Sequence, residues 1–107
     1  MLVDGSQGYV LTADVCDIDC DFYVMTGHKL FGPTGIGVLC GKSAHLASIP
    51  PFDGGVDMIR EVSRSGAIHG NPPHRFEAGT PPIVEAIALG ADIDCIDSIG
   101  ERQIRRQ

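Results

Sequence analysis

Short apolar runs alternate with turns rich in glycine and proline along this chain of 107 residues. The runs at 2–3, 20–25 and 35–40 are too short for helices and are predicted to be buried strands. Because only a few residues separate the second run from the third, these two strands are expected to be antiparallel neighbours. Residues 83–96 instead place apolar side chains at helical spacing. This pattern predicts a helix with one apolar face that packs on the sheet and ends at Gly100.

Acidic residues outnumber basic ones, which narrows the choice of partner. The net charge of −6 at pH 7 argues against nucleic acid, and no signal peptide or membrane-spanning run is expected. The cysteines form no Cys-x-x-Cys pair, and no histidine lies at metal-ligand spacing from them. The Asp17-x-Asp19-x-Asp21 cluster lacks the Gly and Glu of an EF-hand calcium loop, so no metal site is expected. Apolar neighbours predict buried, reduced thiols in a reducing cytoplasm. The cysteines are Cys16, Cys20, Cys40 and Cys95.

One lysine lies in a glycine-bounded turn between two predicted strands. The amine of Lys29, held at a strand end, is suited to form an imine with a carbonyl ligand, and the flanking glycines would let backbone or ligand approach closely. Thr26 and His28 would supply hydrogen-bond donors for an anion such as phosphate. From residue chemistry alone, a solvated turn lysine is the more common alternative.

Two further element ends carry candidate ligand groups. Asp4 follows the first predicted strand, and open α/β sheets bind ligands beyond the carboxyl ends of their parallel strands; a turn-forming aspartate is the more common alternative. Thr80 precedes prolines at the start of the predicted helix, where hydroxyl and backbone N–H groups can bind an anion. The alternative for Thr80 is a plain helix N-cap. Residues 8–19 are expected to form an irregular or helical surface connector.

Four stretches together carry a resemblance to a known family. They occur in the family's order and at nearly its spacing: 21–37 around Gly27-His28-Lys29, 3–7, 58–59 after a Gly-Gly pair, and 75–81. Over almost its whole length the chain resembles the class V aminotransferases, and within them the cysteine desulfurases of iron–sulfur assembly. The resemblance implies the α/β fold of fold type I enzymes that use pyridoxal 5′-phosphate (PLP), with a mixed, mostly parallel sheet and packing helices. It also implies that residues 1–107 are part of the large PLP-binding domain, truncated at both ends.

The resemblance implies a role for each candidate residue. Lys29 would bind PLP covalently and move protons on the substrate. Asp4 would pair with the cofactor's ring nitrogen, and Gln7 would form a hydrogen bond with its phenolic oxygen.

The remaining implied contacts concern the phosphate. Thr26 and His28 would bind it, and Thr80 would reach the phosphate held by a neighbouring subunit, which implies a homodimer. Arg75 and Glu77 would support the loop that carries Thr80.

The implied activity converts L-cysteine to L-alanine and passes sulfur, through an enzyme persulfide, to a sulfur-acceptor protein in the cytoplasm. The family's sulfur-accepting cysteine, substrate-binding arginine and ring-stacking histidine match no residue of this chain, so the chain alone is expected to be inactive. Selenocysteine lyase, another class V reaction and a non-catalytic truncated remnant stay open as alternatives. The matched residues handle the cofactor and do not select the substrate.

Overall fold

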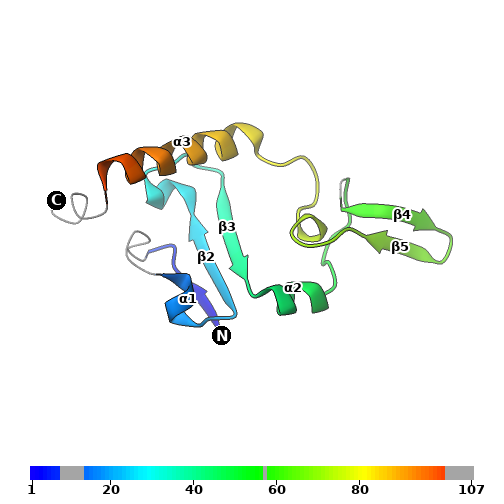
Figure 1. Cartoon of the computed structure of the whole chain (residues 1–107). Helices are drawn as coiled ribbons and strands as arrows, with labels where there is room; N and C mark the ends of the chain where they lie inside the picture. The colour runs from blue at the N-terminus through cyan, green and yellow to red at the C-terminus, as the bar shows by residue number, and fades with distance from the viewer. Residues whose placement is uncertain (8–13, 57, 101–107) are drawn as a thin grey trace. The chain divides into compact units, whose positions relative to one another are not determined.

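The computed structural model describes residues 1–7, 14–56 and 58–100. The chain forms two compact units (Figure 1). Met1–Gly41 and Pro82–Gln107 make up the first unit, and Lys42–Pro81 makes up the second.

A mixed sheet of three short strands forms the centre of the first unit (Figure 1). β1 (Leu2–Asp4) pairs in parallel with β2 (Phe22–Thr26), and β2 pairs in antiparallel fashion with β3 (Gly37–Gly41). The three predicted strands and the predicted antiparallel pair are therefore confirmed. The predicted burial is wrong for β1 and β3, where Leu2 is 62% exposed and Leu39 is 55% exposed. Because β1 and β2 run in the same direction, their carboxyl ends lie at one edge of the sheet.

The connector between β1 and β2 contains one short helix, α1 (Val15–Ile18). The carboxylate of Asp14 caps it by accepting a hydrogen bond from the backbone N–H of Cys16 over 2.8 Å. The predicted irregular or helical connector is thus confirmed for residues 14–19, and residues 8–13 lie outside the described part of the chain.

The long helix α3 (Ile83–Ile99) runs across the end of the sheet where β2 finishes (Figure 1). Its buried residues are Leu89 and Ile96. The helix was expected to pack on the sheet, but its main contact is with the turn that follows β2. There the Cδ1 atom of Leu89 lies only 2.9 Å from the position that a Cβ would take on Gly32. Gly100 ends the helix, as predicted, and donates its N–H to the carbonyl of Ile96.

The prediction of a single apolar face on α3 is wrong. Besides the buried pair, the helix exposes large apolar side chains at Ile83, Val84, Ile87, Ile93 and Ile99. Apolar side chains therefore lie on more than one side of α3, which also carries the acidic residues Glu85, Asp92, Asp94 and Asp97. Within the described ranges, no helix combines the length and apolar character that a bilayer crossing requires.

The second unit contains a hairpin that the sequence analysis missed. β4 (Ile59–Ser63) and β5 (Gly66–His69) are antiparallel, and the unit also contains the helix α2 (Ser43–Ser48) and the 3-10 turn η2 (His74–Phe76).

Arg75 contacts two backbone carbonyls within the second unit. Its Nε donates to the carbonyl of Gly70 over 2.9 Å, and its guanidinium also donates to the carbonyl of Ala47 over 3.3 Å. Glu77 lies 3.6 Å from the Nδ1 atom of His74, on the η2 turn. The partners in these contacts are Gly70, Ala47 and His74, so the expected support of the loop that carries Thr80 stays a prediction.

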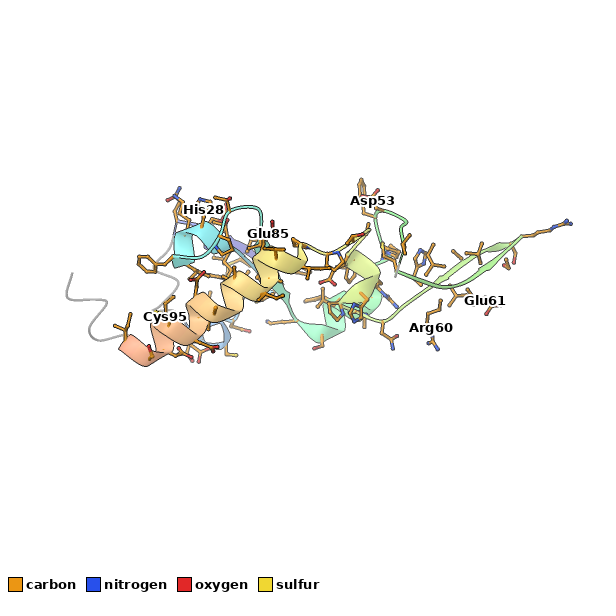
Figure 2. All side chains as sticks on the ribbon, turned by 90° about the horizontal axis from the view of Figure 1, so that it is seen from above. His28, Asp53, Arg60, Glu61, Glu85 and Cys95 are labelled. Carbon is orange, nitrogen blue, oxygen red and sulfur yellow. The ribbon has the colours of Figure 1, made fainter. Side chains whose placement is uncertain are left out.

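The prediction that all four cysteines are buried is wrong. Cys20 is buried and Cys40 is partly exposed, whereas Cys16 and Cys95 are exposed, and all four are free thiols. Cys95 stands on the surface of α3 (Figure 2). Cys16 lies on α1 beside Asp14, whose negative charge raises the pKa of the Cys16 thiol and keeps it protonated. Apolar sequence neighbours did not imply burial here, because α1 has only one turn and α3 exposes an apolar side.

Residues 1–107 expressed alone should self-associate or lose fixed tertiary packing. The described residues bury few large apolar side chains and expose many, including Phe31, Phe52 and Val84, and contiguous exposed apolar surface favours association. Sedimentation velocity and near-UV circular dichroism test this expectation. Replacing the exposed Ile87 with lysine should reduce the association. A monomer with a cooperative melt would contradict it.

Candidate active site

The edge where β1 and β2 end gathers five of the six predicted site residues. β2 runs directly into the 3-10 turn η1 (Gly27–Leu30), and β1 runs into a turn at Ser6 and Gln7. The five residues are Asp4, Gln7, Thr26, His28 and Lys29. Their elements all belong to the first unit.

The lysine and the glutamine are in direct contact at this edge. The Nζ of Lys29 donates a hydrogen bond to the Oε1 of Gln7 over 3.2 Å, although 22 positions separate the two residues. Both side chains are exposed on the surface. Since Oε1 accepts from the lysine, the amide nitrogen of Gln7 is available to donate to a ligand at the same edge.

Asp4 is held as a carboxylate by the turn that follows it. Its Oδ1 accepts a hydrogen bond from the backbone N–H of Ser6 over 2.9 Å. Hydrogen bonds from the Ser6 side chain, first, and from its backbone lower the pKa of Asp4, and they outweigh the smaller opposing effect of desolvation. The turn-forming role that the sequence left open therefore exists, and it leaves a negative charge at the carboxyl end of β1.

Replacing Ser6 with alanine should raise the pKa of Asp4 toward its usual value. The variant removes the largest cause of the lowered pKa and keeps the backbone N–H, so part of the effect should remain. A folded-state pKa below the unfolded one contributes stability above the unfolded pKa, and this contribution is lost as the pH falls through the folded pKa. Carboxyl-carbon NMR titration of the whole protein measures the shift, with Ser48→Ala as the control. An unchanged Asp4 titration in Ser6→Ala would contradict the assigned cause.

Thr26 and His28 form a pair beside the lysine. The Oγ1 of Thr26 and the Nδ1 of His28 are 3.0 Å apart, and Figure 2 shows His28 on the η1 turn. If the hydroxyl donates, the neutral imidazole carries its proton on Nε2; if Nδ1–H donates, the hydroxyl proton is free. Either arrangement leaves one donor of the pair for an anion.

The lysine turn is tightly closed against the chain that follows it. Gly27 donates its N–H to the carbonyl of Ile36 over 2.9 Å, and a Cβ on Gly27 would lie 2.8 Å from the Cγ2 of Ile36. The group that approaches Gly27 closely is therefore the side chain of Ile36, and not a ligand. Phe31 ends η1 with φ of 63°, a conformation unusual for a bulky residue.

Thr80 does not start the helix. The N-cap of α3 is Pro82, without a side-chain cap, so the N-cap alternative for Thr80 is wrong and the prolines precede the helix. Thr80 is exposed and belongs to the second unit. Its expected contact with a neighbouring subunit therefore stays a prediction.

An open cavity of about 460 Å³ in the second unit contains no predicted site residue. It is lined by Gly55, Val56, Ile59, Arg60, Glu61 and Val62. Among the residues that the structure describes, no group of three His, Cys, Asp or Glu could hold a metal ion.

The family model for class V aminotransferases matches residues 1–107. The chain therefore belongs to the class V aminotransferase family. It is 52% identical over 102 residues to a cysteine desulfurase of Dickeya dadantii, and 51% identical over 104 residues to a probable cysteine desulfurase of Xylella fastidiosa. These matches cover 94% and 96% of the chain but only 25% of each relative, so the chain spans about a quarter of the length of these curated relatives.

Solved structures give the same result for the fold. The chain is similar to the crystal structure of the cysteine desulfurase CsdA from Escherichia coli, with a TM-score of 0.88 and 46% identity, over 95% of this chain and 26% of that one. It is also similar to an apo cysteine desulfurase from Thermococcus onnurineus, with a TM-score of 0.89 and 39% identity, over 99% and 27% of the two chains. The expected α/β architecture of fold type I is confirmed.

Proposed function

We propose that the whole protein is a PLP-dependent cysteine desulfurase, and that residues 1–107 supply part of the cofactor site in its large domain. The reaction would convert L-cysteine to L-alanine and pass the sulfur to an acceptor protein. The names of relatives about 50% identical to this chain support the substrate. The observation that carries the proposal is the contact of Lys29 with Gln7 at the edge that also holds Asp4.

The side chains at this edge fit the functional groups of PLP. An amine suits the cofactor's aldehyde, a carboxylate suits its ring nitrogen, an amide donor suits its phenolic oxygen, and a hydroxyl–imidazole pair suits its phosphate. These groups belong to Lys29, Asp4, Gln7, Thr26 and His28. When bound, PLP supplies an electron sink for the electron pair left on the substrate Cα.

Lys29 and Gln7 act on the reacting side. The amine of Lys29 attaches the cofactor and then takes and returns protons at the substrate carbon. The hydrogen bond to Gln7 holds this amine at the edge where β1 and β2 end, and the amide nitrogen of Gln7 would donate to the phenolic oxygen.

Asp4, Thr26 and His28 bind and orient. The turn at Ser6 lowers the pKa of Asp4 further below neutral, and the ionised carboxylate could keep the ring nitrogen protonated. Thr26 and His28 together offer a donor to the phosphate in either hydrogen-bond arrangement.

The proposal extends to assembly and location. A homodimer would let the exposed Thr80 reach the phosphate of the neighbouring subunit, and a sulfur-acceptor protein would take up the product sulfur for iron–sulfur assembly. The four free cysteines are consistent with a reducing cytoplasm.

A product assay tests the proposed function directly. The purified whole protein should take up PLP in a 1:1 ratio and form alanine and sulfide in equal amounts from L-cysteine with a thiol reductant. L-selenocysteine, assayed in parallel, separates the selenocysteine lyase alternative. PLP uptake without alanine formation would contradict the desulfurase assignment and keep the cofactor assignment.

A further inference from the structure

Tyr23 is a buried aromatic residue behind the cofactor edge. Its exposed fraction is 4%, and it pairs with Val3 in the parallel ladder of β1 and β2. Gly5 lies two residues beyond Val3 and therefore near the same face of the sheet. The tyrosine ring reaches past Val3 and fills the space where a side chain of Gly5 would stand.

The steric exclusion at Gly5 comes from this ring. A Cβ built on Gly5 would overlap the Cζ and Oη atoms of Tyr23 and would lie 2.6 Å from its Cε1. The backbone of Gly5 does not itself require glycine, because its φ is outside the left-handed region. Its N–H donates to the carbonyl of Val24 over 2.8 Å. Gly5 is thus clamped between a β2 carbonyl and the Tyr23 ring.

We propose that Tyr23 is a positioning residue for the cofactor site. Gly5 joins Asp4, the last residue of β1, to the turn that carries Gln7. The ring that fixes the position of Gly5 therefore also fixes where the side chains of Asp4 and Gln7 lie. One of them contacts Lys29 across 22 positions of sequence. Without the ring, this segment could shift toward the vacated space, and small shifts of positioned groups are costly in active sites. The inference rests on the proposed function for the identity of the ligand only.

A double-mutant cycle tests whether the ring seats Gly5. Gly5→Ala should lower the melting temperature of the whole protein strongly when Tyr23 is present and much less in the Tyr23→Ala background. Tyr23→Phe keeps the ring, so Gly5→Ala should remain as disruptive in that background as in the parent. Additive effects of Gly5→Ala and Tyr23→Ala would overturn the proposal.

Measuring PLP affinity tests whether the contact between Tyr23 and Gly5 affects the cofactor site. Tyr23→Ala should raise the dissociation constant of PLP by about tenfold or more, and should shift the pH midpoint of the bound-PLP absorbance, whereas Tyr23→Phe should retain the parent values. The matched control is Ile96→Ala, which removes a side chain of the same unit that is 8% exposed and should lower stability without changing either value.

Equal PLP affinities of folded Tyr23→Ala and Ile96→Ala would overturn the positioning role. If the parent protein bound no PLP at all, the proposed function would fail. The double-mutant cycle would then still decide whether Tyr23 seats Gly5, because its readout is the melting temperature.

Discussion

Lys29→Ala should abolish both the visible absorbance of covalently held PLP and the turnover of L-cysteine. The variant removes the amine that attaches the cofactor and moves protons on the substrate. Positioned proton transfer alone contributes roughly 10²- to 10⁴-fold to rates, so the loss of activity should be at least of that order. The side chain is exposed and its described hydrogen bond goes to Gln7, so the fold should survive the substitution.

The chain itself provides the control for this experiment. Its second lysine, Lys42, is exposed and precedes α2 in the other unit. Lys42→Ala should leave the absorbance and the turnover near the parent values. Retention of the covalent PLP absorbance in Lys29→Ala, or its loss in Lys42→Ala, would contradict the assignment of Lys29.

Asp4→Ala should leave PLP attached and slow turnover on the order of a hundredfold or more, the usual cost of removing one electrostatic stabiliser. A carboxylate beside the ring nitrogen keeps that nitrogen protonated, and a neutral ring withdraws electrons less effectively. Asp4→Asn distinguishes the role of the charge from the role of the turn. The variant removes the charge, but its amide oxygen can still accept the hydrogen bond from the N–H of Ser6 that Asp4 accepts over 2.9 Å.

Steady-state assays of both variants at saturating PLP decide the role of Asp4. We expect Asp4→Asn to be nearly as slow as Asp4→Ala. Replacement of Asp17, which is exposed in the first turn of α1, should have little effect. Turnover within twofold of the parent in both Asp4 variants would show that Asp4 serves only the turn.

The strands of the first unit could be predicted because each is a short apolar run with a glycine-rich boundary. The hairpin of β4 and β5 was missed, although Ser65-Gly66 between two short strand-like runs was an available turn signal. The two-sided apolar character of α3 was misjudged, although Ile87 and Leu89 are two positions apart and therefore point to nearly opposite sides of a helix. Helix α3 also begins at Ile83, after the prolines that were expected to open it.

For the candidate site, too, the sequence predicted some features and missed others. Asp4, Gln7 and Lys29 could be proposed from the family resemblance, and their strand ends could be placed at one edge from the pattern of strands. The hydrogen bond between Lys29 and Gln7 depends on the register of β1 against β2, which no local pattern reveals. The same register brings the ring of Tyr23 against Gly5. In the sequence alone, Tyr23 could not be distinguished from an ordinary core residue.

Mapping the site of PLP attachment tests the assignment of Lys29 as the residue that binds the cofactor covalently. The whole protein is incubated with PLP, reduced with borohydride and digested, and the peptides are analysed by mass spectrometry. We expect one phosphopyridoxyl group per chain, carried by Lys29 in the peptide that contains Thr26 and His28. Attachment to Lys42, to a lysine elsewhere in the whole protein, or to no lysine would contradict it.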